Sequence, residues 1–407
     1  MAGGANGNSG RQRILVAGCG IAGSLIATGL RDEPGVEVIC LERATTVDHA
    51  DAGTGVNIGP NGIKSLSGFM PEQAEALVAA SLPWKRWTVA LTSGEELMNL
   101  DLAEVADNDG IRIRWAELYA LLRSPLGDAV HYGAELETCA VADDGRLNAT
   151  WQDKTAGGVE TVEGIDLLIG GDGRYSKVRT AFSGDNPPVF LGVCLYRLLF
   201  SVGPDCPIDD YGQWFNGPNR LLAYRVPGDF VYLAGSFPIP PDSGVPEEMK
   251  QAEALTAVYR PATGVASREA QFLIDAIERH SDSIHWARLQ EASVQFRGPA
   301  ERVLLVGDAA HPMVPTLGQG ATQAMEDACV VVDEVKRALR EGRSLATVPV
   351  AVEERRAERV RFVVDFSRDA TDTMLAGADP RAGTLKKLEP PFREKLERLY
   401  RDVAMPG

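Results

Sequence analysis

Residues 13–23 read Arg13-Ile-Leu-Val-Ala-Gly-Cys-Gly-Ile-Ala-Gly23, and the architecture can be worked out from this stretch. The apolar run Ile-Leu-Val-Ala predicts a buried strand, and the glycines after it predict a tight turn. A short helix is expected over Ser24–Arg31, and Val36–Leu41 forms the next strand. A strand, a helix and a second strand in this order predict parallel strands, and hence an α/β fold with a Rossmann-like domain.

The glycines of this turn are spaced Gly-x-Gly-x-x-Gly, at Gly18, Gly20 and Gly23. That spacing permits a tight turn, a close approach of the backbone to a pyrophosphate and close packing of helix on strand. Glu42 follows the second strand. A carboxylate at this position accepts hydrogen bonds from a ribose 2′-hydroxyl and repels a 2′-phosphate. The pattern therefore predicts a site for the ADP half of FAD or NAD, and not of NADP.

A second strand-to-helix junction lies in the last third of the chain. Val303-Leu-Leu-Val predicts a buried strand that ends at Gly307-Asp308, and an apolar-periodic helix begins near Gly320. Two prolines and two glycines shape the loop between them. Because a helix start presents unpaired N–H groups and positive charge, this junction suits an electron-rich, partly anionic ligand.

The middle of the chain has a different texture. From Val189 to Ser293, strand-like runs rich in aromatic residues are cut by turns of Pro, Gly and Asp. We therefore expect an antiparallel sheet inserted into the α/β core, followed by two helices near 321–340 and 350–374 and a weakly determined tail over 390–407. The expected parts are a disordered leader (1–12), the nucleotide-binding domain (13–184 and 295–345), the inserted sheet domain (185–294) and a C-terminal helical segment (346–407).

Composition excludes several classes of function. A formal net charge of −16 argues against nucleic acid as a partner, because no basic surface exists to neutralise phosphates. The six cysteines are scattered without a Cys-x-x-Cys pair, which indicates reduced thiols in a cytoplasmic protein. The five histidines show no metal-ligand spacing, so no metal is expected. No signal peptide and no membrane-spanning run are visible.

Three segments together resemble the single-component (group A) FAD-dependent aromatic hydroxylases, the para-hydroxybenzoate hydroxylase-like flavoprotein monooxygenases. They are Gly18–Gly23 with Glu42-Arg43, then Asp172–Arg179, then Gly307–Ala328. The loop Gly53–Gly62 also resembles the flavin-facing loop of this family. The segments occur in the order of the family and span most of the chain.

This resemblance implies a Rossmann-like FAD-binding domain with an inserted antiparallel-sheet substrate domain and C-terminal helices. Glu42 would hold the adenosine ribose, Asp308 the ribityl chain, and Asp172 would lie near the pyrophosphate. Pro315 and the Gly318–Gly320 turn would pass beside the isoalloxazine. The sequence departs from the family at Trp115, where an arginine is common, and Arg114 lies one residue earlier. The FAD-contacting residues expected in full are Gly18, Gly20, Ile21, Ala22, Gly23, Glu42, Arg43, Gly55, Val56, Arg114, Asp172, Gly307, Asp308, Pro315, Gly318, Gln319, Gly320 and Ala321.

The activity implied by the resemblance is hydroxylation of a small phenolic or hydroxypyridine-type aromatic, expected to be a carboxylate. It would use FAD, O2 and NADH or NADPH, and transfer oxygen through a C4a-hydroperoxyflavin. No second Gly-x-Gly-x-x-Gly occurs, so the reduced nicotinamide is expected to bind without a domain of its own, to a monomer or homodimer. From their placement we expect His311, Tyr211 and Tyr224 to serve in proton transfer, and Arg197, Trp214, Arg225 and Pro315 to contact the substrate.

Other functions remain open at this stage. A flavin-dependent halogenase on the same fold would carry a Trp-x-Trp-x-Ile-Pro element, which this sequence lacks. A NAD-dependent dehydrogenase would explain Gly18–Glu42 but leave Gly307–Asp327 without a purpose. A reductase or a flavin-binding redox sensor stays an alternative, although an aromatic-rich inserted sheet suits a substrate pocket better.

Overall fold

The computed structural model describes residues 11–46, 54–155 and 157–406. Most of the expected leader (1–12) lies outside these residues, and Gln12 already belongs to the first strand. The first residue of the flavin-facing loop, Gly53, also lies outside them.

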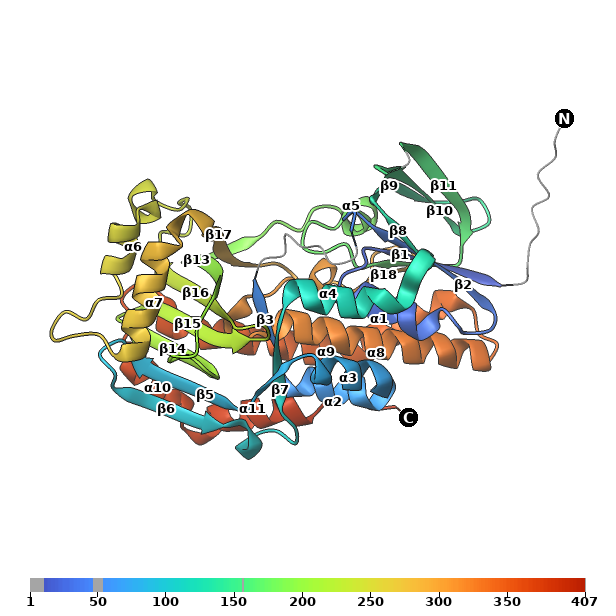
Figure 1. The fold of residues 1–407 in the computed structure, drawn as a ribbon. Coiled ribbons are helices and arrows are strands. Elements are labelled where there is room, and N and C mark those ends of the chain that lie inside the picture. Colours follow the sequence, from blue (N-terminus) through green and yellow to red (C-terminus); the bar gives the residue numbers. More distant parts are fainter. Residues whose placement is uncertain (1–10, 47–53, 156, 407) are drawn as a thin grey trace.

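A parallel sheet of five strands forms the nucleotide-binding core (Figure 1), in the order β18-β12-β1-β2-β8. The register places Val16 of β1 beside Cys40 of β2 and Ile169 of β12. The apolar side chains of β1, β12 and β18 are at most 1% exposed, as expected for parallel strands covered on both faces. This arrangement confirms the predicted Rossmann-like fold. The strands are β1 (Gln12–Ala17), β2 (Val36–Glu42), β8 (Val130–Tyr132), β12 (Leu167–Gly170) and β18 (Val303–Leu305).

Helices α1 (Ile21–Leu30) and α8 (Gln319–Arg340) pack against each other beside this sheet. Their contact is close at Gly29, where an added Cβ would lie 2.7 Å from the Val332 side chain. Helix α1 begins three residues earlier than predicted, because Gly20 already adopts the N-cap position. The two motifs from opposite ends of the chain therefore meet in one place.

A mixed sheet of seven strands forms the second half of the molecule, in the order β17-β13-β16-β15-β14-β5-β6. The segment 185–294 supplies five of these strands, whereas β5 and β6 come from 86–101. Strand β5 joins the sheet by pairing in parallel with β14. The strands are β5 (Arg86–Leu91), β6 (Glu96–Asp101), β13 (Val189–Ser201), β14 (Tyr211–Asn216), β15 (Asn219–Val226), β16 (Phe230–Pro238) and β17 (His285–Glu291).

The two faces of this sheet have different neighbours. One face packs its alternate side chains against helix α7 (Arg268–Arg279), in a separate cluster that includes Tyr196 and Trp214. The other face joins the main core, which it shares with the nucleotide-binding half. Because side chains alternate along a strand, the parity of a residue number decides which face it occupies.

Two small antiparallel sheets contain the remaining strands. The first, β3-β7-β4, lies between the two halves (Figure 1), and the second, β11-β10-β9, is a hairpin extended by a third strand. The turn at Asp143-Asp144-Gly145, a sequence typical of hairpins, joins the antiparallel strands β9 and β10. The strands are β3 (Gly55–Ile58), β4 (Leu82–Trp84), β7 (Gly110–Arg114), β9 (Ala134–Val141), β10 (Leu147–Asp153) and β11 (Gly158–Ile165).

The C-terminal residues are helical. Helix α9 (Val348–Asp369) packs along α8, and the predicted weak tail is instead helix α11 (Pro390–Arg401). The prediction of a tail was wrong because Leu396, Leu399 and Tyr400 repeat at helical spacing and are buried. The other helices are α2 (Pro60–Phe69), α3 (Pro71–Ala79), α4 (Trp115–Arg123), α5 (Lys177–Ser183), α6 (Ala252–Ala257) and α10 (Pro380–Lys387), with short 3-10 turns at η5 (Gly307–Ala309), η6 (Pro315–Leu317) and η8 (Ala370–Met374).

Candidate active site

The glycine-rich turn is shaped by close backbone contacts. Gly18 has a φ of +93°, and a Cβ there would lie 2.5 Å from the carbonyl oxygen of Gly171. Gly20 caps helix α1, and within the described chain no side chain caps this helix end. The first N–H groups of α1 are therefore free for a ligand, as a pyrophosphate site requires.

A pocket of about 200 Å³ opens over this turn. Its lining includes the Gly18 turn, Glu42 and Arg43 from the end of β2, and Asp172. The Asp172 carboxylate accepts hydrogen bonds from the backbone of Lys177 and Val178 through Oδ2, while its Oδ1 is buried without a partner among the described residues. Burial raises the pKa of Asp172. The pocket gathers the residues predicted for the ADP half, and we call it the ADP pocket.

Glu42 is held more tightly than the sequence suggests. Its carboxylate accepts hydrogen bonds from the backbone N–H groups of Cys19 and Ala44, at 3.0 and 2.8 Å, and forms an ion pair with Arg123 at 3.0 Å. Arg123 also donates to the carbonyl of Cys19. Sequence reasoning missed Arg123, because its position at the end of an ordinary amphipathic helix carries no signal. Glu42 and Arg123 together fix the glycine-rich turn.

The second junction forms an open ledge at the start of α8. Gly318 has a φ of +65° and caps the helix, again without a capping side chain within the described chain. A Cβ on Gly318 would lie 2.6 Å from Nδ2 of Asn57, a buried amide nitrogen with no described partner. Pro315 is exposed, and the Asp308 side chain is 41% exposed with only a 3.9 Å contact to Arg174. Unpaired N–H groups, an apolar ring and a free carboxylate fit a flavin ring with its ribityl chain.

His311 lies beneath this ledge and not on it. Its side chain is completely buried, and Nε2 lies 2.6 Å from Oδ2 of Asp327, which also accepts from the N–H of Gly307. The side chain of Gln319 is likewise buried and bonded to Asn61, so only its backbone faces the ledge. The proton-transfer role predicted for His311 gains no support from this position.

A row of aromatic rings lines the core-facing side of the seven-stranded sheet. Tyr232, Tyr224 and Tyr211 stand side by side on β16, β15 and β14, and Trp87 of β5 continues the row. The rings of Tyr211 and Tyr224 stack at 5.6 Å between centroids, and those of Tyr224 and Tyr232 lie 4.9 Å apart. Gly55 of β3 lets the nucleotide-binding half approach, since a Cβ there would lie 2.7 Å from the side chain of Tyr232. The row therefore faces the loop that is predicted to contact the flavin.

One charged residue shares this face and was not predicted. Arg220 of β15 is only 4% exposed, and it forms no ion pair or hydrogen bond among the described side chains; its Nε is buried without a partner. Burial lowers the pKa of Arg220, and the neighbouring Tyr211 and Tyr232 oppose this shift. The signal in the sequence is its spacing of four residues from Tyr224, which places both side chains on one face of a strand.

The predicted substrate residues divide between the two faces. Arg197 lies on the same face as the tyrosine row and has no described ion pair, as expected for a ligand-facing residue. Trp214 and Arg225 lie on the opposite face: Trp214 belongs to the cluster against α7, and Arg225 pairs with Asp229 at 3.0 Å. Neither side chain joins the tyrosine row, so the predicted substrate contacts of Trp214 and Arg225 gain no support from the fold. The sequence does not show which alternate set of side chains faces inward.

Arg114 is engaged elsewhere. Its guanidinium pairs with Glu117 and lies 4.8 Å from the ring centre of Phe230. Of the other predicted FAD residues, Ile21 and Ala22 lie in the buried first turn of α1, Val56 is buried in β3, and Ala321 follows the ledge in α8.

In the part of the chain that the structure describes, no three His, Cys, Asp or Glu side chains form a metal-binding group, and no helix is long and apolar enough to cross a membrane.

Comparisons with known proteins agree with this geometry. The pattern of the FAD binding domain family matches residues 263–367. The 3-amino-4-hydroxybenzoate 2-monooxygenase PtmB3 of Streptomyces platensis is 31% identical over 381 residues, which cover 88% of this chain and 87% of that protein. The chain belongs to the FAD-dependent aromatic monooxygenases.

Further relatives support this assignment. The 6-hydroxynicotinate 3-monooxygenase of Pseudomonas fluorescens is 29% identical over 88% of this chain and 91% of its own. Among solved structures, Klebsiella pneumoniae HpxO complexed with FAD and uric acid superimposes with a TM-score of 0.80 at 21% identity, covering 96% of this chain and 97% of that one. The monooxygenase thus shares its whole fold with proteins that hold FAD.

The residues of this monooxygenase fit FAD on structural grounds. Two uncapped helix starts, at Gly20 and Gly318, present N–H groups where a pyrophosphate and a flavin carbonyl edge would lie. When bound, FAD supplies the electron transfer and oxygen activation that side chains cannot. The protein then has to hold the substrate ring against the ledge and keep water away from it.

Proposed function

We propose that this monooxygenase hydroxylates the ring of a small aromatic carboxylate that carries a hydroxyl or amino group, with O2 and NADH or NADPH as co-substrates. This proposal rests on Arg220, which is buried and forms no ion pair among the described residues. An unpaired charge is costly in a protein interior, by several kcal/mol, unless a ligand compensates it. A carboxylate does so best, because it pairs with both arms of a guanidinium.

The tyrosine row beside Arg220 supplies the aromatic side of the proposed substrate site. Tyr211, Tyr224 and Tyr232 offer flat apolar faces to an aromatic ring. Burial raises the pKa of all three phenols. They therefore stay protonated at neutral pH and donate hydrogen bonds to a hydroxyl or phenolate on the substrate. The three tyrosines therefore act mainly as hydrogen-bond donors. Each can accept a proton only if it passes its own phenolic proton on to another group.

The relatives support a carboxylated ring. Two of them are named for 3-amino-4-hydroxybenzoate and 6-hydroxynicotinate, both of which carry a ring carboxylate. A urate hydroxylase of Klebsiella pneumoniae is 26% identical over 89% of this chain. Urate has no carboxylate group, so it is the informative competitor in any test.

The test is a matched screen of substrates. Hydroxy- and aminobenzoates and hydroxynicotinates are compared with their neutral amides and with urate, for stimulated NADH or NADPH oxidation and mass-detected insertion of one oxygen. We expect the acids to be preferred, and Arg220→Met to raise the KM for the acid by about 10- to 100-fold, the effect of losing one charge-assisted contact.

The control is Arg225→Met, on the same strand but on the opposite face, which should leave the KM nearly unchanged. Equal use of an acid and its amide, or hydroxylation of urate alone, would contradict the proposal.

A further inference from the structure

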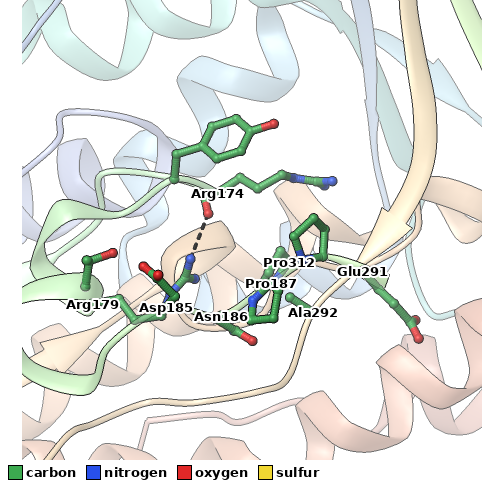
Figure 2. A pocket seen from close by; sticks show the side chains of 11 residues that line it. Arg174, Arg179, Asp185, Asn186, Pro187, Glu291, Ala292 and Pro312 are labelled. Carbon is green, nitrogen blue, oxygen red and sulfur yellow. Dashed lines mark hydrogen bonds between the residues drawn. The ribbon is translucent and has the colours of Figure 1, made fainter. Parts of the chain in front are cut away.

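Arg220, the proposed carboxylate anchor, lies deep inside the protein. The ADP pocket and a second pocket of about 330 Å³ beside Arg174 and Pro312 (Figure 2) are both lined by other residues. Arg220 is only 4% exposed, and Ser236, which lies directly opposite it on β16, is completely buried. A substrate carboxylate that pairs with Arg220 therefore meets the side chain that covers these two strands.

That side chain is Met374. The hydroxyl group of Ser236 donates to Sδ of Met374 at 3.5 Å, and the Met374 side chain is completely buried. Ser236 and Ala234 are small residues on the core-facing side of β16, so they leave room above the sheet that the flexible thioether fills. Because directly opposite side chains on one face of a sheet lie about 4.5–5.5 Å apart at Cβ, Met374 lies beside any group that Arg220 binds.

Met374 is the last residue of turn η8 (Ala370–Met374), which also contacts the ledge at the start of α8. Oγ1 of Thr371 lies 2.7 Å from Oγ1 of Thr316, the residue that follows Pro315. Both threonines are buried. Turn η8 contacts η6 and β16 alike. A single turn thus extends from the place proposed for the flavin ring to the place proposed for the substrate carboxylate.

Lys387 of α10 holds this turn from behind. Its Nζ donates to the carbonyl oxygen of Ala370 at 3.1 Å and to Oγ1 of Thr373 at 3.2 Å. It also pairs with Asp372 at 3.0 Å. Burial lowers the pKa of Lys387, Asp372 opposes this shift, and the charge of Arg220 adds to it. The turn is therefore fixed in place, close enough to Arg220 for the two positive charges to interact.

We propose that Met374 is a specificity-determining residue that covers the ring edge beside the substrate carboxylate and excludes acids with a second ring fused there. The inference rests on the proposed function, since it takes Arg220 as the carboxylate anchor. The unbranched thioether can change rotamer to admit one ring. A second ring at this edge would need the whole space of the side chain, and the anchored turn is not free to move aside.

Binding can be measured without turnover. Benzoate, 1-naphthoate and 2-naphthoate are titrated into the FAD-loaded enzyme without NADH or NADPH, and binding is followed by flavin absorbance and calorimetry. Only 1-naphthoate has its second ring next to the carboxylate. We expect the unaltered enzyme to bind 1-naphthoate at least about tenfold more weakly than benzoate, the usual effect of overpacking a site. Met374→Ala should bind 1-naphthoate about tenfold more tightly than the unaltered enzyme does, with a smaller gain for 2-naphthoate.

Met374→Leu is the matched control, because it keeps the volume of the side chain and should still exclude 1-naphthoate. Met374→Val removes less of the side chain and gives the same test if the alanine variant is unstable. Equal binding of benzoate and 1-naphthoate by the unaltered enzyme would overturn the proposal. Unchanged exclusion in the shortened variants, or an equal gain for both naphthoates, would overturn it too.

The same titrations separate this inference from the proposed function. If none of the three acids binds, Arg220 is not a carboxylate anchor, and both proposals fail. Benzoate binding without any effect of Met374 would count against this inference alone. A failed hydroxylation screen with the expected change in 1-naphthoate binding would count against the proposed function alone.

Discussion

Asp308, which is partly exposed, and Arg220, which is buried, have no close partner among the described residues, whereas most other buried charged side chains there are paired. Asp308 has one contact at 3.9 Å, and Arg220 forms no ion pair among the described residues. Glu326 and Asp327, by contrast, are completely buried and paired with arginines at 2.5–2.8 Å. The two unpaired charges lie where we propose that FAD and the substrate bind, and the paired charges belong to the surrounding frame.

Replacing Asp308 tests the ribityl assignment. Asp308→Ala should weaken FAD binding by about 10- to 100-fold, since a carboxylate that accepts ribityl hydroxyls contributes about 1.5–3 kcal/mol. The measurement is the ratio of flavin absorbance to protein absorbance after purification, followed by a titration of the apoprotein with FAD.

Asp308→Asn is the matched variant, because it keeps one acceptor and should retain more flavin than alanine does. Full flavin content in Asp308→Ala would rule out the assignment.

The sequence predicts the residues of this site unevenly. Gly18, Asp172 and Asp308 can be found because a turn, a strand end and a helix start force them to a known place. Arg220 could not be chosen over Arg225, because a shift of one residue moves a side chain to the other face, and only the pairing of β15 with β14 and β16 sets that register.

Helices α8 and α9 are held together by a buried polar network beneath the ledge at the start of α8. Arg356 of α9 donates to Asp327 at 2.8 Å and to Glu326 at 2.6 Å, and Arg359 adds a second cation to Glu326. Burial would raise the pKa of both carboxyls, but the charges of Arg356 with Arg359 or His311 lower each to about 2. Since Asp327 also bonds the N–H of Gly307, this network positions the residue beside Asp308.

Removing Arg356, the central cation of this network, should therefore destabilise the fold strongly. Arg356→Met leaves two buried carboxylates undercompensated, and we expect a loss of about 3–5 kcal/mol in the free energy of unfolding near pH 7. Groups with a lowered pKa in the folded state stabilise it above their unfolded pKa and lose this contribution as pH falls toward about 2. The difference between the variant and the unaltered protein should thus shrink below about pH 4.5. Urea unfolding across this pH range measures it.

Arg361→Met is the control, because Arg361 is exposed on the same helix. Its effect should stay within about 0.5 kcal/mol at every pH. An equal loss in both variants would mean that the helix, and not the network, is sensitive.

Helices and strands could be predicted where residues close together in the sequence carry the signal. The βαβ unit, the hairpin over β9 and β10, and helix α8 follow from periodicity and turn residues. Helices α6 and α7 were not predicted within the aromatic segment, although Ala270, Leu273, Ile274 and Ile277 repeat at helical spacing in α7. The surrounding strand-like runs hid this pattern.

At the scale of the whole molecule, the last helix, α11, contacts parts of the fold that lie far apart in the sequence. Leu399 of α11 is completely buried, and its carbonyl accepts a hydrogen bond from Arg359 of α9 at 2.8 Å. Phe392 of the same helix contacts Trp87, at the end of the tyrosine row, with 6.4 Å between ring centres. Helix α11 thus connects the buried network with the seven-stranded sheet, a long-range contact that the sequence alone does not reveal.

Shortening one side chain of this helix should weaken the entire fold. Leu399→Ala is expected to lower the free energy of unfolding by about 2–5 kcal/mol, the usual effect of a cavity in a core. Leu385→Ala, at a position 49% exposed, should cost far less. Thermal unfolding followed by circular dichroism and by flavin release compares the two, and similar midpoints for both variants would contradict the closing role of α11.

The mixed origin of the seven-stranded sheet limits how such proteins can be re-engineered. Strands β5 and β6 arrive from residues 86–101, and β13–β17 from a segment about a hundred residues later. Exchanging 189–291 between relatives would join a foreign β14 to the resident β5 and break the row at Trp87. Substrate specificity therefore cannot be transferred by exchanging one segment, and a working chimera has to carry both stretches. Natural recombination at a single pair of crossovers would be selected against.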